Sequence, residues 1–328
     1  MVQKVSPLYQ SEPLSWSDAI PVFSAADSYN ENYAKIAQDH LEAAEKQGID
    51  NPFISDALWR ELEDSTKLLV DKYIPAHSRV LDVGVGLGRV LESYTQLERY
   101  GIDISLDYMA IAQRKGIEVA YARIEDMPYH DEVFDAALSC DVLEHVIDLH
   151  ACCMQIVRVV KKGGTIIIRV PQGEDMNAYL TPSIPYQFVH LRRFDVASLR
   201  LLFEKLYGCE YIEHQFVAPT FTGAHTLAIR TLEAADPFRE TFKQLANGEN
   251  QTKELSQRIW GKRTPEQRSD VFWKIIRHMT VYTQEDIHNN LGIIRDEYPE
   301  LYAQIRPHLV QPLEVNVVFR KKTSPVMT

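Results

Sequence analysis

Three groups of residues have types and spacings suited to chemistry, and the first is a glycine-rich turn. Residues 80–83 form a short, mainly apolar run, and Gly84, Gly86 and Gly88 follow it at alternate positions. Glycine adopts positive φ and lets a backbone approach a ligand without a Cβ in between. The N–H groups at the start of a following helix would attract an acidic or polar ligand. We therefore expect a strand, a ligand-binding turn and then a helix over about residues 87–95.

The second group is a pair of carboxylates around this turn. Asp82 stands two residues before the first glycine, and Asp103 ends the next expected strand. A carboxylate in the latter place can accept hydrogen bonds from both ribose hydroxyls of a nucleoside. The glycines lack the G-x-G-x-x-G spacing of a dinucleotide site, and no G-K-[ST] follows, which excludes a P-loop.

The third group contains acid–base residues from two loops. Asp141, Glu144 and His145 are spaced i, i+3 and i+4, so they share a face if this turn is helical. His190 follows the fifth expected strand, in a loop that also holds Glu174. Three interpretations stay open. In the first, Glu144 and His145 are structural and shape the cofactor loop. In the second, His145 or His190 is a general base, and Asp141 is a further candidate. In the third, Asp141, Glu144 and His145, with or without His190, hold a divalent metal. The sequence favours a site without metal.

Strands and helices alternate around these groups. We expect strands at 79–83, 99–103, 118–121, 134–139 and 165–170, helices at 105–115 and 149–160, and then helix 195–206 and strand 210–217. Such alternation indicates a mainly parallel sheet covered on both faces. Residues 1–27 are expected to form an irregular arm, followed by helices 30–47 and 54–73. Residues 222–312 read as four or five amphipathic helices before a last strand, 313–321, and a block of that length is treated as an inserted cap.

Composition narrows the function classes. The 328 residues carry a net charge of −11, which argues against a general nucleic-acid binder. None of the four cysteines forms a C-x-x-C pair, which fits a reducing compartment. No segment reaches the roughly 18 apolar residues of a spanning helix, and the N-terminus has no apolar signal region. We expect a cytoplasmic protein with a small-molecule substrate, no nucleic-acid or membrane partner, and a homodimer, if one forms, built through the helical additions.

The ordered set of motifs resembles the class I S-adenosylmethionine-dependent methyltransferases, of the broad type that includes small-molecule and quinone-biosynthesis enzymes. Besides the turn and Asp103, the resemblance rests on residues 125–128, 134–146 and 158–164, and it covers about residues 77–217 plus the last strand. It implies an α/β, Rossmann-like, seven-stranded and mostly parallel sheet with an N-terminal helical segment. The implied domains are an arm with helices (1–75), a cofactor-binding core (76–221 plus 313–322) and a helical substrate cap inserted before the last strand (222–312).

The resemblance also assigns residues to S-adenosylmethionine. The turn with Asp82, Gly84, Gly86 and Gly88 would hold the methionine part, and Asp103 the ribose. The remaining assignments are Ile104 as a wall for the adenine, Ile124 and Glu125 as the loop beside the adenine, and Cys140 and Asp141 where the fourth strand opens toward the sulfonium. The family often has an acidic residue where this chain has Arg123, which leaves recognition of the adenine amine to the backbone of 124–126.

These assignments predict methyl transfer to a small metabolite, with oxygen slightly favoured over nitrogen as the acceptor. Alignment and desolvation supply much of the rate of such an in-line displacement, and a hydroxyl acceptor needs a base. One alternative is a metal-dependent O-methyltransferase acting on RNA or a quinone precursor, and another is a non-catalytic cofactor-binding subunit. Tyr29 and Tyr33 are expected to fold over the cofactor. The cap carries an aromatic and histidine set (Trp260, Phe272, Trp273, His278, Tyr282, His288) and a basic set (Arg258, Lys262, Arg263, Arg268).

Overall fold

The computed structural model describes residues 5–49, 51, 54, 56–174, 176–180, 185–221 and 310–323. The chain divides into two compact units, Met1–Val217 with Leu313–Thr328 and Ala218–Pro312. Of the expected cap, 222–312, residues 222–309 with the aromatic and basic sets lie outside the described residues, and 310–312 belong to the last strand, so the three-domain division stays a prediction. Among the described residues, no helix is both long and apolar enough to cross a membrane.

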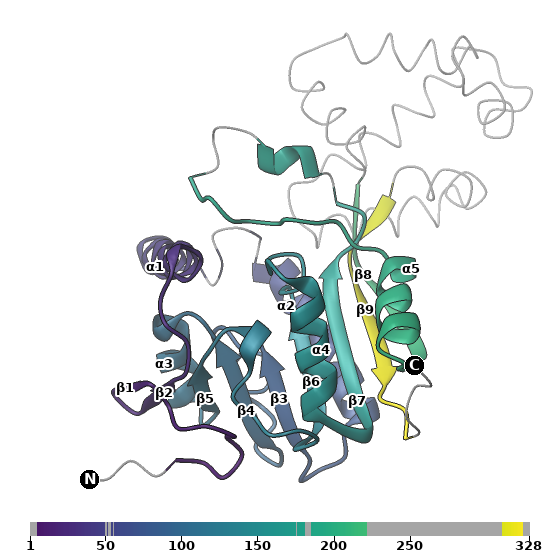
Figure 1. Ribbon diagram of the computed structural model, residues 1–328. Helices are drawn as coiled ribbons and strands as arrows, with labels where there is room; N and C mark the ends of the chain where they lie inside the picture. The colour runs from purple at the N-terminus through teal and green to yellow at the C-terminus, as the bar shows by residue number, and fades with distance from the viewer. Residues whose placement is uncertain are drawn as a thin grey trace, which may run out of the picture. The chain divides into compact units, whose positions relative to one another are not determined.

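A central twisted sheet organises the first unit (Figure 1). Its strand order is β1-β2-β5-β4-β3-β6-β7-β9-β8. The neighbours from β2 to β7 pair in parallel, whereas β1 with β2 and β7 with β9 are antiparallel. The strands are β1 Ser15–Ser17, β2 Ile20–Val22, β3 Arg79–Val83, β4 Glu98–Asp103, β5 Glu118–Tyr121, β6 Phe134–Cys140, β7 Val160–Pro171, β8 Glu210–Phe221 and β9 Val310–Arg320. The predicted Rossmann-like, mostly parallel α/β class is confirmed.

Side chains alternate between two hydrophobic clusters along the central strands. Val80 and Ile167 belong to the cluster that includes Leu69 of α2, whereas Leu81 and Ile166 belong to the cluster that includes Ile156 of α4. Both faces of the parallel sheet are therefore buried. The helices are α1 Ser28–Gln47, α2 Asp56–Tyr73, α3 Leu106–Arg114, α4 Leu149–Val159 and α5 Val196–Arg200, which continues as a π-helical turn over Leu201–Leu206. Short 3₁₀ turns lie at Ile124–Asp126 and Met176–Leu180.

Two local predictions were wrong. The arm predicted to be irregular contributes the hairpin β1–β2, which adds to the β5 edge and raises the strand number from seven to nine. Three-residue strands are too short to show a period of two. The helix predicted over 87–95 is a series of turns, in which Glu92 N–H donates to Gly88 O but Tyr94 N–H donates to Leu91 O. A mixture of four-residue and three-residue spacings does not build a continuous α-helix.

A substitution at Gly88 tests how tightly the glycine-rich turn is packed. A Cβ at Gly88 would lie 2.6 Å from Ile117 Cδ1, and its φ is 71°. Gly48 has a similar φ of 64°, but a Cβ there meets nothing within 4 Å. We expect Gly48→Ala to lower the free energy of unfolding by about 1 kcal/mol, from the left-handed backbone alone. Gly88→Ala should lower it by about 2–4 kcal/mol, because overpacking adds to that strain.

Urea denaturation of the two variants measures this difference. Equal losses of stability in the two variants would contradict the packing described here.

Candidate functional site

A cavity of about 740 Å³ opens at the carboxyl ends of the parallel strands. This volume falls within the range of about 300–1,000 Å³ that is typical of small-molecule sites. The wall is assembled from the loops after five strands, from α1 and from β9, so residues far apart in sequence meet there. The lining includes Tyr29, Tyr33, Gly84, Gly86, Asp103, Ile104, Tyr108, Arg123, Ile124, Glu125, Asp141, His145, Glu174, Tyr179, Tyr186, His190 and Glu314.

The glycine turn and Asp103 hold each other at one end of the cavity. Gly86 N–H donates to Asp103 Oδ2 at 2.8 Å, and Oδ1 accepts from Ile104 N–H and Ser105 N–H at 2.7 and 2.9 Å. Burial raises the pKa of Asp103, and these three hydrogen bonds oppose the increase. An added Cβ at Gly86 would meet only Gly84 O at 4.0 Å, whereas one at Gly84 would overlap Val142 Cγ2. Backbone is thus exposed to a ligand at Gly86 beside a carboxylate, which fits the predicted nucleoside cradle.

Arg123 forms ion pairs within the cavity wall, so its charge is already compensated by neighbouring carboxylates. Its Nη1 lies 2.6 Å from Asp27 Oδ2 and its Nη2 lies 3.0 Å from Glu125 Oε1. The guanidinium also lies over the Tyr29 ring, 4.8 Å from the centroid. Asp27 caps the N-terminus of α1, so Arg123 links α1 to the loop after β5.

Three of the predicted cofactor residues support the wall without lining it. Asp82 is buried, and burial raises its pKa to about 7 despite the positive charge of Arg169. Burial likewise raises the pKa of the Cys140 thiol to about 12, and its Sγ lies 4.0 Å from Thr66 Oγ1. The third, Gly88, packs against Ile117.

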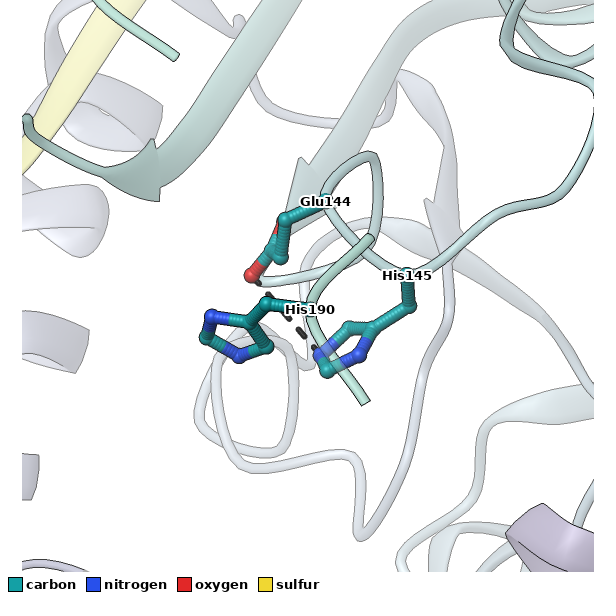
Figure 2. A group of neighbouring side chains, drawn as sticks. All are labelled: Glu144, His145 and His190. Carbon is teal, nitrogen blue, oxygen red and sulfur yellow. Dashed lines mark ion pairs between the residues drawn. The ribbon is translucent and has the colours of Figure 1, made fainter. Parts of the chain in front are cut away.

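Glu144, His145 and His190 form a compact group (Figure 2). One ligand atom from each lies within 4.8 Å of the others, a spacing that could hold a metal ion. Glu144 is only 1% exposed, and neither of its side-chain oxygens has a hydrogen-bond partner. Burial raises the pKa of Glu144 well above its usual range and, together with the neighbouring His190, lowers the pKa of His145 to about 4. Asp141 is not part of this group.

His190 forms an oriented pair with Glu174. The His190 Nδ1 lies 2.6 Å from Glu174 Oε2, and Tyr179 Oη donates to the other oxygen. Burial disfavours ionisation of Glu174, but these hydrogen bonds outweigh it and lower the pKa of this carboxyl. With Nδ1 engaged, His190 Nε2 is the nitrogen available to a ligand.

Asp141 instead pairs with Arg169, a residue that sequence reasoning missed. Arg169 Nη2 lies 2.6 Å from Asp141 Oδ2, and Nε lies 2.8 Å from Glu314 Oε2. Its Nη1 donates to Leu62 O and Thr66 Oγ1, both at 2.9 Å. The one signal in the sequence is an arginine inside the apolar run 165–170. Glu314 carries no comparable signal, because its neighbours in the site lie far away along the chain.

Comparisons with known proteins concern the core of this unit. Residues 81–168 match the family model described as "Methyltransferase domain". The chain is 38% identical over 99 residues to an uncharacterized protein of Methanocaldococcus jannaschii, covering 30% of this chain and 47% of that protein. It is 36% identical over 110 residues to the tRNA (carboxymethyluridine(34)-5-O)-methyltransferase of Arabidopsis thaliana, covering 33% and 27%. It is 32% identical over 124 residues to the ubiquinone biosynthesis O-methyltransferase of a Bradyrhizobium species, covering 35% and 47%. The chain thus spans less than half of each of these relatives.

The buried His145 predicts a pH dependence of stability. Its pKa of about 4 in the folded chain lies below the ordinary value of 6.5, so the unfolded chain binds more protons between these values. The free energy of unfolding should therefore fall as pH decreases from about 6.5 to 4. In His145→Gln the slope in this window should be shallower by up to about 1.4 kcal/mol per pH unit.

Urea titrations at several pH values measure this slope, and the exposed His130→Gln offers a matched control. An unchanged slope in His145→Gln would show that His145 binds a proton equally well in both states.

Proposed function

We propose that the protein is a class I methyltransferase that transfers a methyl group from S-adenosylmethionine to a hydroxyl group of a small molecule. The match of residues 81–168 to a methyltransferase domain supports this proposal. The observation that carries this proposal is that one cavity joins the Gly86–Asp103 cradle to the His190–Glu174 pair. The first fits a nucleoside and the second is a general base with its orienting carboxylate.

The cavity residues have separate roles in cofactor binding and in proton transfer. S-adenosylmethionine supplies a methyl group on a sulfonium whose departure leaves a neutral thioether. Asp103 and the backbone at Gly86 would hold its ribose and methionine parts, with Ile104 and Ile124 beside the adenine. His190 Nε2 accepts the proton of the acceptor hydroxyl, and Glu174 stabilises the imidazolium that results. His145, with its lowered pKa, stays neutral and packs edge-on against His190, 4.6 Å between ring centroids.

Tyrosines over the cavity support an enclosed, small acceptor. Tyr29 and Tyr33 of α1 line it from one side, with 4.9 Å between their ring centroids. Tyr186, from the loop that carries His190, hydrogen-bonds to Asp39 of α1 at 3.0 Å. Exclusion of water strengthens the electrostatic interactions of the site. The net charge of −11 supports a proposal without a nucleic-acid partner, although one of the relatives above is named for tRNA.

Asp103 offers the first test. Asp103→Asn removes the charge that would accept the ribose hydroxyls, and charge-assisted hydrogen bonds contribute about 1.5–3 kcal/mol. Isothermal titration with S-adenosylhomocysteine should show binding to the wild type and a loss of about 10- to 100-fold in Asp103→Asn. The exposed Asp107→Asn on α3 should bind like the wild type. Absence of binding by wild-type protein freed of co-purified cofactor would refute the proposal.

A metal-dependent O-methyltransferase is the second candidate, and the unpartnered carboxylate of Glu144 favours it. A divalent ion on Glu144, His145 and His190 would polarise the acceptor hydroxyl directly. This candidate predicts that Mn²⁺ binds with 1:1 stoichiometry and that Glu144→Gln weakens binding by about tenfold or more. The exposed Glu98→Gln should bind Mn²⁺ as the wild type does.

Mn²⁺ titration of the chelator-treated protein decides between the two candidates. A protein that takes up no Mn²⁺ excludes the metal-dependent reaction and leaves His190 as the base.

A further inference from the structure

The charge of the cavity wall changes along its length. Among the described residues that line it, Arg123 is the single arginine or lysine, and it is engaged with Asp27 and Glu125 at the nucleoside end. At the other end, the lining contains the carboxyl groups of Asp141, Glu174 and Glu314. Burial, and then the neighbouring Asp141, raise the pKa of Glu314 well above its usual range, so a cation at this end would favour its ionised form. That end is therefore acidic.

The cation that accompanies these carboxylates is not accessible to a ligand. Arg169 is 3% exposed, does not line the cavity, and divides its charge between Asp141 and Glu314 at 2.6 and 2.8 Å. One guanidinium thus pairs with two of the three carboxyl groups at this end of the cavity, while Glu174 is hydrogen-bonded to His190 and Tyr179. The carboxyl groups at this end of the cavity therefore outnumber the guanidinium groups that pair with them.

Glu144 independently indicates that a positively charged or donating group is missing from this end. It is 1% exposed, and both of its carboxylate oxygens lack a hydrogen-bond partner. Figure 2 shows the carboxylate directed toward His145 and His190, both of which line the cavity. His145 Nε2 lies 3.8 Å from Glu144 Oε1, which is beyond hydrogen-bond distance. A buried carboxyl group without a hydrogen bond is costly, so a ligand that brings a donor or a positive charge to this end lowers the free energy of the site.

Aromatic rings border the same region. Tyr33 packs edge-on against His145 at 5.6 Å between centroids, and Tyr179 packs against His190 at 4.7 Å. Both tyrosines line the cavity. Aromatic faces attract organic cations, with the larger gains in desolvated sites.

We propose that the methyl acceptor carries an ammonium group in addition to its hydroxyl, and that this ammonium binds among Asp141, Glu174 and Glu314. The inference rests on the proposed methyl transfer. Carboxylates around an ammonium keep it protonated, so it has no lone pair to attack the sulfonium. The ammonium therefore orients the substrate, the hydroxyl is methylated, and substrates bearing a carboxylate or phosphate at this position are rejected.

A metal ion would account for the unpartnered Glu144 but not for the carboxyl groups of Asp141, Glu174 and Glu314. The group that could hold a metal is Glu144, His145 and His190, and it includes none of the three lining carboxylates. An ammonium can form hydrogen bonds to several carboxylates spread around a cavity, because it has three donors and no fixed coordination geometry.

Three probes with one skeleton test the proposal. Tyramine, tyrosol and 4-hydroxyphenylacetate share a phenol and differ in carrying an ammonium, a neutral hydroxyl or a carboxylate. Each is titrated by calorimetry into protein saturated with S-adenosylhomocysteine, in the presence of a chelator. We expect tyramine to bind at least about tenfold more tightly than tyrosol, and 4-hydroxyphenylacetate to bind most weakly.

Variants then test which carboxyl groups cause the preference for tyramine over tyrosol. Glu314→Gln and Glu174→Gln should each reduce the preference for tyramine over tyrosol by about tenfold. Two variants are needed because Glu314 is buried against Arg169, whereas Glu174 is more accessible. Glu204→Gln changes a partly exposed carboxylate that is paired with Arg200 on the π-helical turn, and it should behave as the wild type.

The outcomes distinguish a failure of the ammonium proposal from a failure of the proposed methyl transfer. If S-adenosylhomocysteine binds but tyramine binds no more tightly than tyrosol or 4-hydroxyphenylacetate, or if none of the three binds, the ammonium proposal is overturned and methyl transfer stands. A tyramine preference that persists in both variants also overturns it. If S-adenosylhomocysteine does not bind, the proposed function fails and this inference fails with it.

Discussion

The buried guanidinium of Arg169 connects the core of this protein to its cavity. It stands on β7, contacts Leu62 and Thr66 of α2, and pairs with Asp141 after β6 and Glu314 on β9. Removing one partner of a buried ion pair costs about 3–5 kcal/mol, because the remaining charge stays in a medium that solvates it poorly. The pair with Arg169 also accompanies a left-handed backbone at Asp141, where φ is 56°. The positions of two wall carboxylates therefore depend on one guanidinium, which also contacts α2.

The opposite side of the cavity depends on contacts with α1. Asn32 Oδ1 accepts from Gln187 N–H and Phe188 N–H at 2.9 and 3.1 Å, and its Nδ2 donates to Phe188 O at 2.8 Å. These bonds fix the loop that carries His190, the base in the proposed reaction. Neither α1 nor this loop belongs to residues 81–168, the part that matches the methyltransferase domain. Gly86 and Asp103 thus belong to the matched core, whereas His190 is positioned by segments outside it.

The local parts of the site could be predicted from the sequence. Gly84, Gly86 and Asp103 lie at strand ends, and parallel strands bring such ends to one edge, so their meeting follows from the alternation of strands and helices. The helix after the turn was mispredicted because the hydrogen-bond spacing there changes from residue to residue. The Arg169–Glu314 pair could not be found, since it depends on the pairing of β7 with a strand more distant along the chain. The i, i+3, i+4 spacing also misled, because Asp141 turns toward Arg169 and His190 lies beside Glu144 and His145 instead.

The crystal structure of a complex with S-adenosylhomocysteine tests most directly how the methyl donor lies in the cavity. We predict ribose hydroxyls within hydrogen-bond distance of Asp103, adenine between Ile104 and Ile124, and a sulfur that faces His190 across space for the acceptor. A ligand bound with its ribose away from Asp103, or with its sulfur turned away from His190, would contradict the proposed methyl transfer.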